Sequence, residues 1–327
     1  MKKIAIIGLG NLGSRHLQAL ALLKETITIE LVDVSESSLN IAVERFYEVP
    51  EAKNYQGTIH RYMSINNLSE QLDLVIVACN SKERRALTEE LLNKKNVKYL
   101  ILEKVLFPFI EDYEIIARLL KNKGVKAWVN CSRRMMPSYH AIKGRITPGL
   151  PIDISIVGSN WGMASNGIHF IDLFCYLTEN HTLKLNMFAL DEDNPKESNR
   201  KGYVDFTGTV VGKTERGDFF RMSSHSTGSL PIQVSIQTPA ERILINEYLG
   251  NGIFSSPTNQ WKGELFDFEI VYQSRLTAWL AESLFQTGTC DLTEYEEATT
   301  LHKLYLSSLM EYQTLKSGKE VNICQIT

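Results

Sequence analysis

A glycine-rich turn at residues 8–13 constrains the fold of this chain more than any other feature of its sequence. The turn follows the apolar run Ile4–Ile7 and precedes a helical pattern. Its residues are Gly8, Leu9, Gly10, Asn11, Leu12 and Gly13. In this context the first glycine permits a tight turn, the second lets the backbone approach a pyrophosphate, and the third lets helix and strand pack closely. The pattern predicts a dinucleotide-binding turn; the alternative is a glycine-rich turn without a ligand.

Short β-rich runs alternate with helical patterns from residue 3 to about residue 130. The runs are Ile4–Ile7, Ile27–Val32, Leu74–Ala78, Tyr99–Leu102 and Val125–Val129, with helical segments near 12–24, 36–46, 82–95 and 111–122. This alternation predicts a doubly wound parallel sheet, and Gly124 stands where the last helix needs a C-cap. We therefore expect an α/β Rossmann domain over residues 1–130.

Beyond residue 150, strand-like segments follow one another with only turn residues between them. They are Tyr203–Val211, Asp218–Ser224, Ile232–Ile236 and Arg242–Asn246. Helical spacing of apolar residues recurs in Gly167–Leu177, Gln273–Phe285 and Tyr295–Tyr312. Adjacent strands without helices between them predict antiparallel pairing, so we expect an α+β domain over residues 131–327.

Composition narrows the class of partner. The 35 basic and 38 acidic residues give a net charge of −3, which indicates neither nucleic-acid binding nor an acidic tail. No apolar stretch approaches the roughly 20 residues that cross a bilayer, and Met1–Ile7 is typical of a strand rather than an export signal. The cysteines are Cys79, Cys131, Cys175, Cys290 and Cys324, with no C-x-x-C pair. We expect a cytoplasmic protein with a small-molecule partner, no metal and no disulfide framework.

An acidic residue ends the second predicted strand. Asp33 lies twenty residues after Gly13, where a carboxylate accepts hydrogen bonds from the adenosine ribose hydroxyls. A 2′-phosphate there would meet Asp33 and the segment Ser35–Ser38, with no Arg or Lys to neutralise it. NAD is therefore favoured over NADP. The alternative is that Asp33 or Ser35 caps the following helix.

Five motifs in this order resemble the Gfo/Idh/MocA oxidoreductases. They are GLGNLGSRHLQAL at Gly8–Leu20, DLVIVACN at Asp73–Asn80, LEK at Leu102–Lys104, SRRMMP at Ser132–Pro137 and GIHFID at Gly167–Asp172. The resemblance implies a Rossmann domain joined to a C-terminal domain with an open sheet that binds substrate and forms homodimers or homotetramers. It also implies cofactor contacts from Ala78, Cys79, Asn80, Glu103 and Lys104.

Typical substrates of that family are sugars, cyclitols and nucleotide-linked sugars, whose secondary alcohol carbon exchanges hydride with the nicotinamide. Such chemistry needs a base for the hydroxyl proton. Lys104 follows a parallel strand at its ligand-binding end, and desolvation near NAD⁺ would favour its neutral amine. The resemblance makes His169 a second proton-handling residue, with Asp172 one turn later to orient it. The alternatives are a solvated lysine and a structural histidine.

Three departures from the family pattern affect the chemistry. The family commonly has an Asp four residues before the histidine, where this chain has Ser165, and a proline after the lysine, where it has Val105. The histidine beyond the fourth strand is replaced by Arg84. Either Ser165 and Asn166 bind substrate or water while Lys104 alone handles the proton, or ordinary dehydrogenase activity is altered.

Substrate contacts are expected near the domain junction. Trp161, Ser165 and Asn166 lie in a polar segment that suits a sugar, although an anchored loop is the alternative. Arg133 and Arg134 suit a carboxylate or phosphate, although one of them is expected to brace the junction. The leading hypothesis is an NAD-dependent sugar or polyol dehydrogenase or reductase, by analogy in surface-polysaccharide biosynthesis. The alternatives are an epimerase or glycosidase with resident NAD and an NAD(H)-binding sensor.

Overall fold

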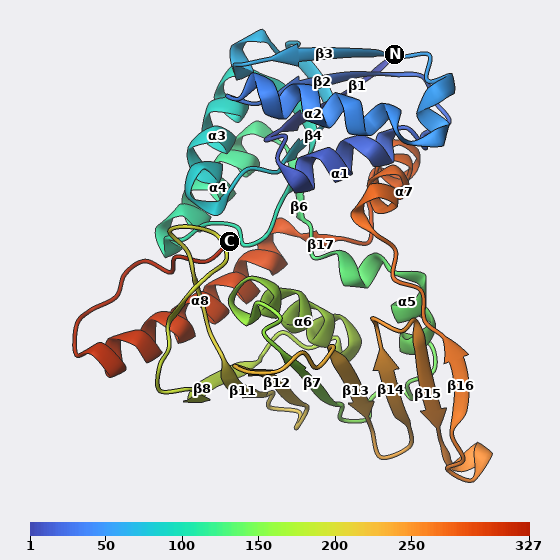
Figure 1. Ribbon diagram of the computed structural model, residues 1–327, viewed down its shortest axis with the longest axis vertical. Helices are drawn as coiled ribbons and strands as arrows, with labels where there is room; N and C mark the ends of the chain where they lie inside the picture. The colour runs from blue at the N-terminus through green and yellow to red at the C-terminus, as the bar shows by residue number, and fades with distance from the viewer. The chain divides into compact units, whose positions relative to one another are not determined.

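The computed structural model describes residues 1–327 and divides the chain into two compact units (Figure 1). The first unit comprises Met1–Ser132 and Val271–Ala298, and the second comprises Arg133–Ile270 and Thr299–Thr327. The sequence-based division placed everything after residue 130 in the second domain. Val271–Ala298 belongs to the first unit instead, because an amphipathic helix carries no sequence signal of the distant element against which it packs.

A seven-stranded sheet with the order β17-β6-β5-β4-β1-β2-β3 forms the centre of the first unit. Its strands are β1 (Lys2–Ile7), β2 (Ile27–Val32), β3 (Thr58–Tyr62), β4 (Gln71–Val77), β5 (Asn96–Leu102), β6 (Lys126–Val129) and β17 (Thr293–Glu294). All neighbours pair in parallel except β17, which is antiparallel to β6. The predicted Rossmann-type sheet is confirmed. The edge strand β3 escaped prediction because it has no buried residue and therefore no apolar run.

Five helices complete this unit. They are α1 (Asn11–Leu20), α2 (Glu36–Tyr47), α3 (Ser81–Lys94), α4 (Ile110–Lys123) and α7 (Gln273–Thr287). Helix α1 packs against α2 and α7, and α3 packs against α4. Gly124 ends α4 in the left-handed conformation with a φ of 64°, which confirms the predicted C-cap.

An eight-stranded sheet with the order β16-β15-β14-β13-β7-β12-β11-β8 forms the second unit, beside the short pair β9 and β10. The strands are β7 (Asp153–Ser159), β8 (Lys184–Leu190), β9 (Lys196–Glu197), β10 (Val204–Asp205), β11 (Gly208–Lys213), β12 (Phe219–His225), β13 (Gln233–Gln237), β14 (Arg242–Asn246), β15 (Asn251–Ser255) and β16 (Glu264–Asp267). Only β7 and β12 pair in parallel. The sheet is thus mainly antiparallel, as the sequence predicted.

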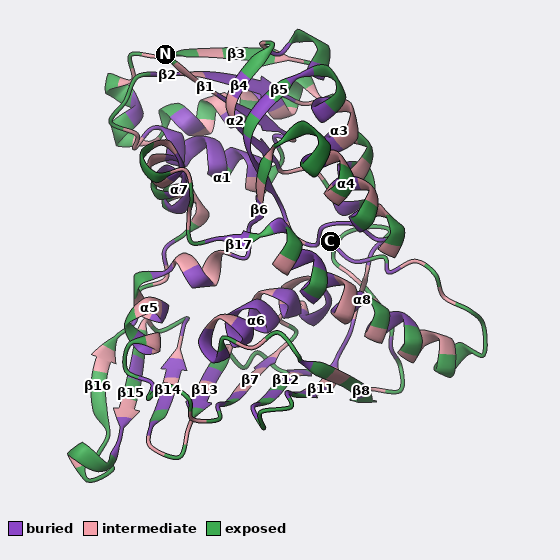
Figure 2. Cartoon of the chain, turned by 180° about the vertical axis from the view of Figure 1, so that it is seen from behind, coloured by how far each residue is buried: buried purple, intermediate pink, exposed green.

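Three helices accompany this sheet: α5 (Pro137–Lys143), α6 (Met163–Thr178) and most of α8 (Tyr295–Ser317), which begins in the first unit. Helix α6 packs against β12, and its many buried residues are visible in Figure 2. Along β7, Ile154 and Ile156 are buried while Ser155 and Val157 are partly exposed. One face of the sheet therefore packs on the core and the other is open. None of the helices combines the length and the apolarity that a bilayer span requires.

Candidate active site

The glycine turn closes tightly against β4 but leaves one side open. Gly8 has a φ of +91°, and a Cβ there would lie 2.7 Å from the backbone nitrogen of Cys79. A Cβ on Gly13 would lie 1.9 Å from the carbonyl oxygen of Gly8. A Cβ on Gly10, by contrast, would meet nothing within 4 Å. The first and third glycines are thus required for the fold, while the second borders open space.

The open space at Gly10 lies at the amino end of α1. Gly10 is the N-cap residue, no side chain caps the helix, and its first turn contains no acidic residue. The first N–H groups of a helix lack intrahelical partners and favour a negatively charged ligand. An uncapped helix start beside free space for a phosphate fits the dinucleotide that the sequence predicts.

Asp33 lies beside the same turn. One carboxylate oxygen accepts the backbone N–H of Leu9 at 2.7 Å, and the other accepts that of Ser35 at 2.8 Å. The N-cap of α2 is Ser35, whose hydroxyl accepts the N–H of Ser38 at 3.2 Å. Asp33 is therefore not the cap of that helix. Each carboxylate oxygen has a second lone pair, so a half-exposed Asp33 retains acceptor capacity for ribose hydroxyls.

The loop after β4 also adjoins the glycine turn. The N–H of Ala78 donates to the carbonyl of Ile7 at 2.7 Å, and the backbone of Cys79 lies against Gly8, so this loop starts next to the glycine turn. Burial raises the pKa of the Cys79 thiol, and the nearby Arg84 only partly opposes this effect. Cys79 is therefore a neutral thiol near pH 7 and not a nucleophile.

Arg84, which replaces the family histidine, connects two loops of the site. Its buried guanidinium donates to the carbonyls of Cys79 and Val105, and to that of Leu106 at 2.8 Å. These carbonyls follow β4 and β5, so one side chain ties the loop after β4 to the loop after β5, which contains Lys104. The peptide bond between Lys104 and Val105 is cis.

We predict that Arg84→Lys destabilises the protein by about 2 kcal/mol, because an ammonium cannot reach three carbonyls as the planar fork does. Urea unfolding measures the difference. Arg85→Lys is the matched control, since Arg85 forms a partly exposed pair with Glu89 at 3.0 Å and should change stability by less than about 0.5 kcal/mol. Equal losses in both variants would contradict the anchoring role.

Lys104 is half-buried immediately after Glu103, which belongs to a buried polar network. Glu103 accepts a hydrogen bond from Asn130 and pairs with Nε2 of His16 at 2.9 Å. The other ring nitrogen of His16 lies 2.8 Å from the hydroxyl of Thr277, and Asn130 donates to Gln273 at 2.8 Å. The buried carboxylate of Glu103 is therefore occupied by Asn130 and His16, and it fixes the start of the loop that follows β5. The network joins α1, β5, β6 and α7.

Sequence reasoning missed most of this network. His16 lies within the Gly8–Leu20 motif, and this position could have identified it as a candidate residue of the site. Gln273 and Thr277 were not identifiable, because their helix was assigned to the other domain. Their positions explain why α7 belongs to the first unit: it supplies polar partners to a buried histidine.

The pKa of Glu103 is lowered, because hydrogen bonds from His16 and Asn130 outweigh the effect of burial, which alone would raise it. The unfolded state then binds more protons in acid, so this stabilisation is complete above about pH 4.3 and is lost as the pH falls through the lower folded-state value. We predict that Glu103→Gln makes urea-unfolding stability less sensitive to pH below that point. Glu25→Gln, at an exposed pair with Lys2, should leave the acid dependence unchanged; a wild-type acid slope in Glu103→Gln would refute this.

The second unit places the remaining predicted residues at the start of α6. Ser165, Asn166 and His169 are half-buried on the first turns of this helix. The Asn166 amide donates to the carbonyl of Trp161 at 2.8 Å, and the indole of Trp161 donates to the carbonyl of Ser223 at 2.9 Å. Trp161 thus anchors the loop while staying partly exposed. Ser165 and His169, four residues apart, share one side of α6.

The two arginines predicted to bind an anion have carboxylate partners within this unit. Arg133 forms a two-pronged pair with Glu247 at 2.9 and 2.8 Å, and Arg134 forms one with Asp172 at 2.9 and 2.7 Å. The carboxylate of Asp172, which was expected to orient His169, also pairs with Arg134, and its role toward His169 stays a prediction. These buried pairs account for both arginines, so no substrate anion is needed to explain them.

Comparison with known proteins identifies related folds. Residues 2–131 match the model of a family described as an oxidoreductase family with an NAD-binding Rossmann fold. No curated protein sequence matches the chain. An oxidoreductase from Agrobacterium radiobacter, solved in complex with NAD+, L-tartaric acid and magnesium, has a TM-score of 0.71 at 16% identity, covering 98% of both chains.

Two further solved structures resemble the chain over most of its length. A super-repressor mutant of Gal80p from Saccharomyces cerevisiae has a TM-score of 0.71 at 16% identity, covering 98% of this chain and 97% of that one. UDP-N-acetylglucosamine 3-dehydrogenase from Acidithiobacillus ferrooxidans has a TM-score of 0.70 at 11% identity, covering 94% and 96%. At these identities the likeness establishes the fold alone.

Proposed function

We propose that this chain, whose residues 2–131 match the model of an oxidoreductase family with an NAD-binding Rossmann fold, exchanges hydride with a secondary alcohol or ketone of a sugar, cyclitol or nucleotide-linked sugar. The observation that carries the proposal is the position of Lys104. It follows the carboxyl end of β5, where ligands bind in doubly wound sheets, in the unit that contains the open glycine turn. The buried anchors Glu103 and Arg84 hold this loop on both sides.

In the oxidising direction the substrate loses the proton of a hydroxyl group and a hydride from the carbon that bears this group. A bound NAD⁺ would supply the hydride acceptor. The neutral amine of Lys104 takes the hydroxyl proton, so the carbonyl product, the reduced cofactor and an ammonium balance the reaction. The reverse direction uses the same groups with Lys104 as the acid.

His169 is proposed as a second proton-handling residue on the substrate side. Its helix also presents Ser165 and Asn166, whose hydroxyl and amide suit sugar hydroxyls. Ser165 cannot carry a proton as the family carboxylate does, which leaves Lys104 as the principal base. This division of roles requires Lys104 and His169 to meet at one substrate carbon.

We further propose that NAD is preferred over NADP, because a 2′-phosphate would lie against the Asp33 carboxylate. Replacing Asp33 by Ser should raise the dissociation constant of NADH by about tenfold or more, with a smaller effect on NADPH. Fluorescence titration with both cofactors measures this. Asp73→Ser is a matched control. Asp73 also accepts a backbone N–H, that of Lys3 at 2.8 Å, but it lies near the amino end of β4, away from the glycine turn. Tighter NADPH than NADH binding by the wild type would overturn the preference.

Deuterium transfer tests the reaction itself. The protein is incubated with deuterium-labelled NADH and the oxidised forms of inositol, hexoses and a UDP-linked N-acetylhexosamine, and the products are analysed by mass spectrometry. We expect one deuterium on one alcohol carbon of a single substrate class. An epimerase or glycosidase with resident NAD would retain its cofactor and show no net transfer.

A specific observation supports a sensor as the second candidate. Ser165 replaces the family carboxylate, and the structures with this fold include one described as the transcriptional regulator Gal80p from Kluyveromyces lactis. A sensor would bind NADH tightly and transfer no deuterium to any member of the panel. That outcome would reject the enzyme proposal while leaving the cofactor site intact.

We also propose that the chain forms a homodimer or homotetramer through the eight-stranded sheet. Leu265 is 81% exposed and lies opposite Ile253 in the pairing of β15 with β16, which is unusual for a fully solvated sheet. Light scattering after size-exclusion chromatography should give a mass of two or four chains. Leu265→Glu should lower that mass, and a monomeric wild type would contradict the proposal.

A further inference from the structure

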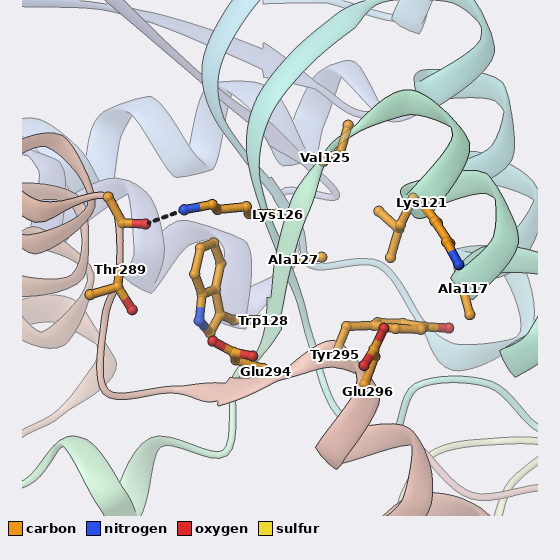
Figure 3. A pocket seen from close by; sticks show the side chains of 12 residues that line it. Ala117, Lys121, Val125, Lys126, Ala127, Trp128, Thr289, Glu294, Tyr295 and Glu296 are labelled. Carbon is orange, nitrogen blue, oxygen red and sulfur yellow. Dashed lines mark hydrogen bonds between the residues drawn. The ribbon is translucent and has the colours of Figure 1, made fainter.

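A cavity of about 410 Å³ lies at the edge of the first unit's sheet, where β17 covers only half of β6 (Figure 3). The two residues of β17 pair with Val129 and Trp128, and the chain then turns into α8. Lys126 and Ala127 therefore have no strand partner on this side. The volume falls within the range of small-molecule pockets, about 300–1,000 Å³.

Trp128 contributes a buried donor to this cavity. The residue is 2% exposed, its ring packs edge-on against Tyr99, and its indole N–H has no hydrogen-bond partner. Buried donors are nearly always paired, because leaving one unpaired is costly. Figure 3 shows the indole nitrogen pointing toward the carboxylate of Glu294, yet the two form no hydrogen bond. A group that bridges them would satisfy both.

The charges that line the cavity specify the chemistry of that group. They are two ammonium groups, Lys121 and Lys126, and two carboxylates, Glu294 and Glu296. An anion would be repelled by the carboxylates, and a cation by the lysines. The hydrogen bond from Lys126 to the carbonyl of Gly288 is long, at 3.4 Å, so this donor and this acceptor lie next to each other and are only weakly paired. A hydroxyl group both accepts and donates, so it suits such donor–acceptor couples.

We propose that this cavity binds a small uncharged polyhydroxyl molecule. One hydroxyl accepts the N–H of Trp128 and donates to Glu294, and further hydroxyls bridge Lys126 to Gly288 and Lys121 to Glu296. A peptide strand fits less well, because only two residues of the β6 edge are uncovered. The cavity lies toward the amino end of β6, whereas the glycine turn, Asp33 and Lys104 follow carboxyl ends of the parallel strands. It is thus separate from the proposed hydride-transfer site and does not depend on it.

The test is a titration with myo-inositol followed by the indole ¹H–¹⁵N resonance of Trp128, assigned by its loss in Trp128→Phe. We expect a saturable shift of this resonance. Glu294→Ala should weaken the affinity about tenfold, because it removes a charged acceptor. Glu111→Ala, which removes an exposed carboxylate of α4 outside the cavity, should leave the affinity unchanged.

Sodium acetate and methylammonium chloride serve as the charged probes, and neither should shift the resonance. A shift with either of them but not with myo-inositol would overturn the proposal. No shift with any probe would mean that a single bridging water satisfies Trp128, and would overturn it as well. If Trp128→Phe does not fold, calorimetric titration of the wild type and Glu294→Ala with myo-inositol decides the question, and equal affinities reject the site.

Discussion

Replacing Lys104 by Met should lower kcat by at least about a hundredfold while the dissociation constant of NADH stays within about twofold of the wild type. Methionine preserves the length of the side chain but cannot exchange a proton. The glycine turn and Asp33 belong to other elements and remain intact. Steady-state kinetics on the substrate found by deuterium transfer, together with NADH fluorescence titration, measure the two quantities.

Lys98→Met is the control, because Lys98 is an exposed lysine within β5, the strand that precedes Lys104. It should leave both turnover and NADH binding unchanged. Unchanged turnover in Lys104→Met would remove Lys104 from the chemistry and shift the acid–base role to His169. A parallel loss of NADH affinity would instead mean that the lysine holds the cofactor.

Gly10→Ala should weaken NADH binding by about a hundredfold or more and leave the thermal stability of the cofactor-free protein nearly unchanged. A Cβ on Gly10 meets no protein atom within 4 Å, and its φ of −64° suits alanine, so the chain tolerates the methyl group. The methyl group occupies the open space at the start of α1, where the pyrophosphate must approach the backbone closely. Fluorescence titration and thermal unfolding test the two halves of the prediction.

Gly13→Ala separates the structural role of the turn from its role in cofactor binding. Its Cβ would lie 1.9 Å from the carbonyl oxygen of Gly8, so this variant should lose stability even without the cofactor. If Gly10→Ala bound NADH as the wild type does, the turn would not be the pyrophosphate site. If both variants lost stability equally, the open space at Gly10 would not exist in solution.

The fold was predictable where the residues of one element are sufficient to determine its structure. The run Ile4–Ile7, the glycine turn and the left-handed Gly124 are local features whose structure follows from local physical chemistry. The edge strand β3 and the helix α7 were not predictable. The first has no buried face, and the second is buried against an element more than 250 residues earlier in the chain, α1.

The candidate site divides in the same way. Asp33 and Lys104 follow strand ends, where parallel-sheet topology alone predicts ligands. Arg133 and Arg134 suited an anion by residue type, but their partners Glu247 and Asp172 are distant in sequence and were not identifiable from it. The buried contacts of His16 with Glu103 and Thr277 likewise depend on three separate elements. Sequence motifs locate candidate groups, whereas their buried partners decide which of them remain available to a ligand.

The most direct measurement of the central claim is a crystal structure of the protein with NADH and the substrate that accepts deuterium. We predict that one substrate carbon lies against the nicotinamide, with its oxygen within hydrogen-bond distance of the Lys104 amine and His169 lining the same cavity. A structure in which no open cavity joins the nicotinamide, Lys104 and His169 would contradict hydride exchange as the function of this chain.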